Sequence, residues 1–140
     1  MSAKFGTVTQ VIGPVIDVSF EGGKDAIPPI YSALKVEREN GETLILEVEQ
    51  HIGESTVRCV AMESTDGLCR GVKVENLGHP IAVPTGAQVK GRLLNVIGEP
   101  IDHLPELSRE NLRPIHQPAP AFDDLAISTE ILYTGIKVID

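Results

Sequence analysis

Hydrophobic and polar residues alternate over roughly the first eighty positions of the chain, with the period of two that is typical of β-strands. Between Val15 and Phe20, the apolar side chains of Ile16, Val18 and Phe20 fall on one face of such a strand. Residues 55–62 alternate in the same way. Both segments are therefore expected to be strands with one buried face and one polar face.

Residues 31–52 contain the clearest signal, two alternating runs separated by Asn40-Gly41. An Asn-Gly pair between such runs favours a two-residue hairpin turn, because both turn positions take a positive φ angle. We therefore predict an antiparallel hairpin with a two-residue turn at Asn40-Gly41. Its apolar face comprises Leu34, Val36, Leu44, Leu46 and Val48.

Several short strands separated by turn signals, with no helix signal among them, form a sheet whose open edges invite aggregation unless the sheet closes or is covered. A small closed antiparallel barrel is the most economical fold for about eighty residues of this kind. The composition agrees, since 41% of the residues are hydrophobic but only 4% are aromatic, which favours β-branched strands. The predicted fold class is mainly β.

The pattern changes in the second half of the chain. Residues 98–124 contain five prolines and little periodicity, which excludes a regular helix and a central strand. This segment exceeds an ordinary connection, so it is either a surface excursion or a stretch that lies over a partner domain. Further on, Thr134 is a suitable N-cap, and a helix is predicted over residues 135–140. Because such a helix would have about two turns and no C-cap, the sequence is expected to stop inside a domain.

The formal net charge of −8 argues against a nucleic-acid surface, because phosphate binding depends on clustered Lys and Arg, and the basic residues here are scattered. Tyr31 and Tyr133 are also too isolated to form a base-stacking platform. No apolar stretch approaches the ~18–20 residues that span a bilayer. The first residues lack the features of a secretory signal or transit peptide, so the protein is expected to be cytosolic or to be made where it works. Cys59 and Cys69 have no CxxC partner and are predicted to be structural thiols rather than a disulfide or zinc site.

Residues 21–25, with the sequence EGGKD, are the only superficial candidate for a phosphate-binding loop. A P-loop of the form GxxxxGK[ST] cradles phosphate with successive backbone N–H groups and places a hydroxyl on Mg²⁺. The segment lacks the first glycine at the required spacing, and Asp25 stands where Ser or Thr is needed. It is predicted to be a loop between barrel strands.

Other reactive side chains show no catalytic arrangement. Ser108 and Ser128 lie in polar segments where turn and capping roles are common, and no GxSxG segment is present. Glu47 and Glu49 would share one face of a strand and are predicted to be solvated on the outside of the barrel. The histidines lie apart, without the spacing of metal ligands: His51, His79, His103 and His116. From the residues alone, we assign no catalytic, cofactor-binding or metal-ligating residue.

An ordered series of segments resembles the β subunits of F-type ATP synthases, from about residue 5 to residue 140. The series comprises FGTVTQVIGPVIDVSF, PPIYSALKV, LEVEQHIGESTVRCVAM, TDGLCRG, HPIAVPTG, GRLLNVIGEPID, RPIH and EILYTGIKVID. Each segment alone is weak, but their order and spacing together are specific. PPIYSALKV, GESTVRCVAM and NVIGEPID are similar to the catalytic β subunit rather than to the non-catalytic α subunit, whereas residues 104–111 form a loop that varies within the family.

The resemblance implies a six-stranded barrel at residues 1–80. Over residues 81–140 it implies the incomplete start of a RecA-like α/β nucleotide-binding domain, including the proline-rich connection at 98–124. In this family, α and β barrels alternate in an α3β3 ring around a γ shaft, peripheral to the cytoplasmic face of a bacterial membrane or its organelle equivalent.

The implied activity of the full subunit is ATP synthesis or hydrolysis with Mg-ATP or Mg-ADP, coupled to proton flow. The family's P-loop follows residue 140, so these residues are expected to supply assembly contacts and to show no nucleotide binding or turnover. Two other interpretations stay open. One is a self-sufficient barrel used as an interaction module, such as an oligonucleotide-binding fold. The other is a subunit of a vacuolar- or secretion-type hexameric ATPase.

Overall fold

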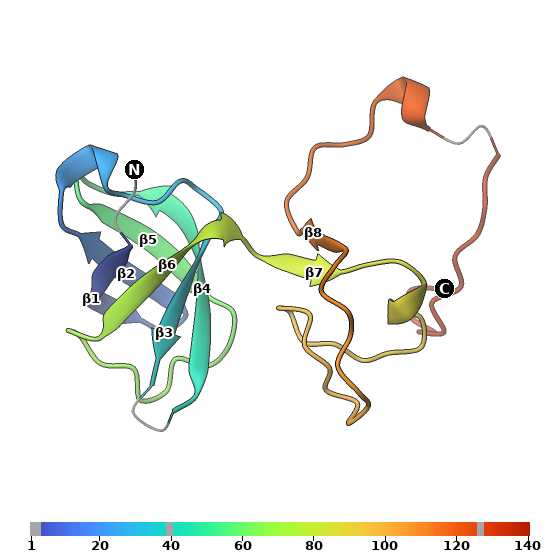
Figure 1. The fold of residues 1–140 in the computed structure, drawn as a ribbon, viewed down its shortest axis with the longest axis horizontal. Helices are drawn as coiled ribbons and strands as arrows, with labels where there is room; N and C mark the ends of the chain where they lie inside the picture. Colours follow the sequence, from blue (N-terminus) through green and yellow to red (C-terminus); the bar gives the residue numbers. More distant parts are fainter. Residues whose placement is uncertain (1–3, 39–40, 126–127) are drawn as a thin grey trace.

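The computed structural model describes residues 4–38, 41–125 and 128–140. Six antiparallel strands close into a barrel in the order β1-β2-β5-β4-β3-β6, which confirms the predicted fold class (Figure 1). Because β1 pairs with β6 as well as with β2, the described part of this sheet has no free edge. The strands are β1 (Phe5–Ile12), β2 (Val15–Phe20), β3 (Ser32–Glu37), β4 (Thr43–His51), β5 (Thr56–Ala61) and β6 (Lys73–Pro80).

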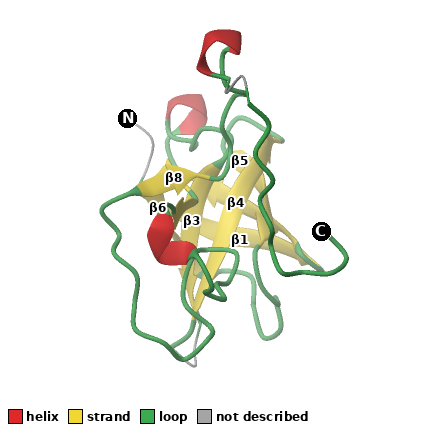
Figure 2. Cartoon of the chain, turned by 90° about the vertical axis from the view of Figure 1, so that its right-hand side faces the viewer, coloured by secondary structure: helices red, strands yellow, loops and turns green. Residues whose placement is uncertain are grey.

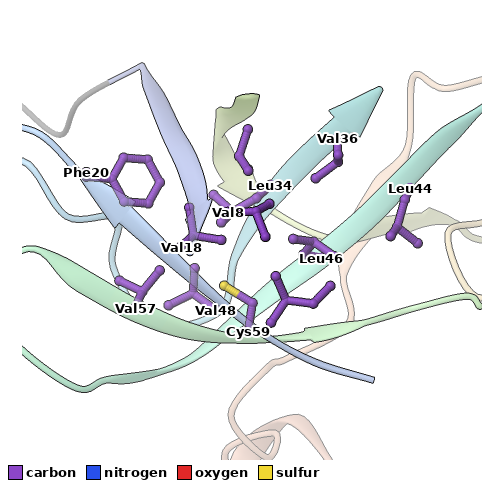
Figure 3. Close-up of a cluster of buried hydrophobic side chains, with 12 residues drawn as sticks. Val8, Val18, Phe20, Leu34, Val36, Leu44, Leu46, Val48, Val57 and Cys59 are labelled. Carbon is purple, nitrogen blue, oxygen red and sulfur yellow. The ribbon is translucent and has the colours of Figure 1, made fainter. Parts of the chain in front are cut away.

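The interior of the barrel is filled by the apolar residues that recur at every second position of the strands. Figure 3 shows side chains from β1 to β5 converging on one another, with Phe20 as the largest fully buried side chain. No member of this core exposes more than 1% of its surface. The core comprises Val8, Ile16, Val18, Phe20, Leu34, Val36, Leu44, Leu46, Val48, Val57, Cys59 and Val74.

The predicted hairpin is present, but its turn is longer than predicted. Leu34 lies opposite Leu46, and the Arg38 N–H donates to the Glu42 carbonyl at 2.9 Å, so three residues rather than two separate the arms. The prediction of a two-residue turn was therefore wrong. Gly41 takes the left-handed conformation (φ +84°), and its N–H donates to the Arg38 carbonyl. A three-residue loop of this kind needs glycine at one position only. Asn40, the other half of the predicted turn, lies outside the described residues.

Cys59 and Cys69 are both free thiols, in opposite environments. Cys59 belongs to the barrel core, where burial raises the pKa of its thiol to about 12, with smaller contributions from the charges of Asp17 and Glu49. Cys69 is exposed in the turn between β5 and β6. Since the thiolate is the reactive form, these two cysteines differ in both access and reactivity.

We expect a thiol reagent at pH 8 to label one cysteine per native chain and two after denaturation. Cys69→Ser should abolish native labelling. Above pH 9 the thiol of an unfolded chain ionises while folded Cys59 stays protonated, so the contribution of Cys59 to stability should fall as pH rises toward 12. Unfolding measured at pH 8 and pH 10.5, with Cys59→Ala as reference, checks this. Equal labelling of both cysteines in the native chain would contradict the buried position.

Beyond the barrel, the chain runs from β6 into β7 (Ala82–Pro84), which pairs with β8 (Leu112–Pro114) in a separate two-stranded sheet (Figure 1). Figure 2 shows β8 from the side, in a view turned by 90°. β8 lies within the proline-rich segment, as three exposed residues in a sheet with only one partner strand, where proline is tolerated. The remaining regular elements there are short 3-10 turns, η2 (Ala87–Val89) and η3 (Phe122–Asp124). Nothing in the described part of the chain is a helix of the length and hydropathy that crossing a membrane requires.

The helix predicted over residues 135–140 is absent, and the prediction was wrong. Gly135 has φ +76°, which is left-handed, and the segment folds as a single turn with the Asp140 N–H donating to the Ile136 carbonyl. The Asp140 carboxylate accepts hydrogen bonds from the Thr134 hydroxyl and from the backbone N–H groups of Thr134 and Gly135, and these bonds hold its pKa below the usual range. One turn of helix costs more backbone entropy than its hydrogen bonds recover.

Candidate functional site

Reactive side chains are dispersed over the described structure. Residues 21–25 form a loop between β2 and β3 that includes the 3-10 turn η1 (Gly23–Asp25), as predicted. The Ser108 hydroxyl accepts a hydrogen bond from the Glu110 N–H, which confirms its turn role. In the described ranges, no group of three or more His, Cys, Asp or Glu side chains could hold a metal ion.

Glu47 departs from the prediction that both outward glutamates of β4 are solvated. Its side chain does point out of the barrel, since its neighbours Leu46 and Val48 fill the core, but only 3% of the residue is exposed. Glu49, by contrast, is exposed as predicted. The carboxylate of Glu47 is therefore covered by another part of the chain. Periodicity along β4 assigns a face to each residue but does not reveal what covers that face.

His116 is the residue that covers Glu47. Nε2 of His116 donates to Oε1 of Glu47 at 2.9 Å, across 69 positions of sequence. The imidazole also stacks on the Tyr31 ring, with the ring centroids 4.0 Å apart and the planes at 21°. The other carboxylate oxygen, Oε2 of Glu47, is buried and has no hydrogen-bond partner within the described part of the chain. Two of the scattered residues, His116 and Tyr31, thus meet on the outer face of β4.

Tyr31 is positioned by the loop that leads into β3. Tyr31 has φ +68°, a strained value for a non-glycine residue, and its N–H donates to the Val48 carbonyl at 2.7 Å. Three residues earlier, Pro28 is fully buried, and its carbonyl accepts a hydrogen bond from Nε2 of His51 at 2.8 Å. These contacts bind the loop to the end of β4 and bring the Tyr31 ring over the barrel wall.

The grouping of Tyr31, Glu47 and His116 was missed from sequence. The three residues lie in separate segments, and nothing in a single sequence links positions 47 and 116. The one local hint is the Ile-Pro-Pro-Ile stretch before Tyr31, because two successive prolines fix the path of the loop.

A bidentate ion pair lies on another part of the barrel wall. Asp17 on β2 is only 5% exposed, and its two carboxylate oxygens accept from Nε and an Nη of Arg58 on β5 at 2.8 and 2.9 Å. The hydrogen bond that Arg58 donates to Asp17, and then the charge of Asp17, raise the pKa of Arg58. This pair joins two adjacent strands and places the arginine side chain on the outer surface of that wall.

A second bidentate pair organises the loop after η2. Arg92 binds the Asp102 carboxylate at 2.6 and 3.1 Å, and both side chains are largely buried. The hydrogen bond from Arg92, with further N–H bonds from Leu104 and Leu93, holds the pKa of Asp102 far below its usual range. Within the loop, Gly98 packs so closely on Pro84 that any side chain there would clash. The loop is thus fixed against β7.

The wall formed by β1, β6 and β3 presents alternating charges around an exposed aromatic ring. Nζ of Lys73 lies 3.6 Å from the centroid of the Phe5 ring, within the range of a cation–π contact. Lys4 pairs with Glu75 at 3.5 Å on the same wall. A shallow groove of about 350 Å³ runs between them and is lined by Phe5, Lys35, Glu37, Val72, Lys73 and Glu75. Its exposed aromatic ring and its charges of both signs are suited to contact with another protein.

Exposed large hydrophobic residues are concentrated in the second half of the chain. Fourteen of the nineteen found in the described ranges lie from Leu93 onward, including Phe122 at 87% exposed and Val138 at 96%. Apolar surface on this scale is typical of a region that packs against another domain or chain.

A comparison with protein-family models places the barrel in a known family of domains. The model described as "ATP synthase alpha/beta family, beta-barrel domain" matches residues 8–78, which is half of the chain. The matched range begins within β1 and ends within β6, so it coincides with the closed barrel.

Proposed function

This chain belongs to the ATP synthase alpha/beta family, whose β-barrel domain it contains, and we propose that it is the N-terminal part of the catalytic β subunit of an F-type ATP synthase. The family includes both α-type and β-type subunits. Support for the β type comes from PPIYSALKV, GESTVRCVAM and NVIGEPID, which are similar to the catalytic subunit.

The role proposed for the barrel is assembly, as one member of a ring in which α and β barrels alternate. The observation that carries this role is the closure of the six strands, which coincides with the family match. Since closure leaves no strand edge for a neighbour to pair with, contacts between barrels must be made by side chains. The wall around Phe5 and Lys73 offers an aromatic ring and charges of both signs for such contacts.

Residues 81–140 are proposed to be the start of the nucleotide-binding domain. Their exposed apolar side chains, such as Leu132 and Ile139, support this, because they would pack against the remainder of that domain. The 140 residues hold no GxxxxGK[ST] segment, so Mg-ATP binding and turnover would belong to another part of the subunit. In the whole enzyme the subunit would sit peripherally on the membrane, with α subunits and a γ shaft as partners.

A segment exchange tests the assignment. Residues 1–140 would replace the corresponding segment either in the catalytic subunit or in the non-catalytic subunit of an F-type synthase. We expect hexamers with ATPase activity from the catalytic-subunit chimera and no hexamers from the other, measured by size-exclusion chromatography and ATP hydrolysis. Assembly only from the non-catalytic chimera would refute the β assignment, and assembly from neither would refute an F-type ring altogether.

A further inference from the structure

Residues 112–118, here called the strap, cross from the small sheet to the barrel wall. β8 pairs with β7, and the Ile115 N–H donates to the Ile81 carbonyl at 3.0 Å. The next residue, His116, then reaches β4 and contacts Glu47. Every residue of the strap is exposed, so it is not held by burial in a core of its own. Beyond the pairing of β8 with β7 and the Ile115–Ile81 hydrogen bond, the strap is tied to the barrel wall by the contacts of His116 with Glu47 and Tyr31.

The two carboxylate oxygens of Glu47 are not equally satisfied in this attachment. Glu47 is almost fully buried beneath the strap, yet only one of its carboxylate oxygens receives a hydrogen bond, from His116. A buried carboxylate with a free oxygen carries a desolvation cost that water would remove. The Tyr31 ring adds a stacking contact to the imidazole, which favours the closed arrangement. The stacking on Tyr31 thus favours the closed arrangement, and the unpaired Glu47 oxygen favours the open one.

We propose that Tyr31, Glu47 and His116 form a releasable latch that holds the strap on the outer face of the barrel. In the closed state His116 supplies the hydrogen bond to Glu47. In the open state the strap leaves the barrel wall, and water hydrates both carboxylate oxygens of Glu47. The barrel stays folded, because its core lies on the other side of the sheet. The latch links the barrel, which the family model matches, to His116, which lies outside the matched residues. It does not depend on which subunit type the chain represents.

Hydrogen exchange followed by mass spectrometry tests the latch in the 140-residue chain. His116→Phe keeps a ring that can stack on Tyr31 but leaves the buried carboxylate without a donor. We expect exchange in peptides covering residues 112–118 to become about tenfold faster, while peptides from the β3–β4 hairpin keep their rates, which also verifies that the variant is folded. Unchanged exchange of the strap in His116→Phe would overturn the proposal.

A double variant separates the latch from a general packing effect. In Glu47→Leu/His116→Phe both polar partners are replaced by apolar ones, so no buried charge remains to favour opening. We expect its strap to exchange within about threefold of the unmodified chain, or more slowly. Glu49→Gln, on the same strand but exposed, is the matched control and should leave the strap unchanged. A double variant as open as His116→Phe, or a Glu49→Gln variant that opens the strap equally, would contradict the role assigned to Glu47.

Discussion

Phe20→Ala is expected to lower the free energy of unfolding by about 3–5 kcal/mol. Phe20 is the largest side chain that is fully buried, and it lies in a core built otherwise from aliphatic residues and one cysteine. Removing the ring loses its transfer free energy and leaves a cavity that a closed barrel has little freedom to collapse, because each strand is fixed by neighbours on both sides. Since small domains have only about 5–15 kcal/mol of stability, this loss is a large fraction of the total.

Urea unfolding followed by far-UV circular dichroism measures this loss. Phe122→Ala removes the same side chain from a site that is 87% exposed, so it serves as the matched control and should leave the midpoint unchanged. If the two variants unfold at the same urea concentration, the placement of Phe20 in the core is wrong.

Gly6→Ala is expected to destabilise the barrel by about 1–3 kcal/mol, although it adds a single methyl group. A Cβ at Gly6 would lie 2.9 Å from atoms of Phe20, Val18 and the Ser19 carbonyl. Two of these belong to the core and the third to the paired backbone of β2, so none can withdraw without moving the strand. The absent side chain is thus what lets β1 approach β2 closely over Phe20.

Gly53→Ala is the control for this effect, because the nearest atom to its Cβ would be Thr56 Cβ at 4.0 Å. That change should be neutral or slightly stabilising, through a smaller backbone entropy in the unfolded chain. Thermal unfolding of the two variants side by side provides the measurement. A Gly6→Ala chain as stable as Gly53→Ala would show that β1 and β2 do not approach as closely as described.

The barrel core was predictable because it follows from one physical rule. Alternation in a strand fixes which side chains point inward, and positions such as Ile16, Leu34 and Leu46 were assigned to the apolar face and are fully buried. The conformations of the turns were less predictable from the sequence. Asn40-Gly41 favoured a two-residue turn locally, but the pairing of Leu34 with Leu46 set a three-residue loop, because strand register depends on both arms at once.

The candidate site was much less predictable. The predicted solvation of Glu47 failed because burial of an outward residue depends on a segment far along the chain, and local pattern carries no such information. The helix predicted after Thr134 failed for a different reason: caps and propensity describe how a helix begins, whereas its persistence needs either length or packing partners. The resemblance to the family in the sequence depended on the order of several segments and not on any single one.

Closure of the barrel also sets the order in which it can fold. The β3–β4 hairpin pairs residues close in sequence, whereas closure pairs Phe5 with Glu75 and therefore requires a long loop to form first. Hairpins can thus form early, and the seam between β1 and β6 should be the slow step. During synthesis, β1 must wait for β6 to emerge from the ribosome. Until then the first strand has an open edge, and this is the interval in which the nascent chain is most exposed to aggregation.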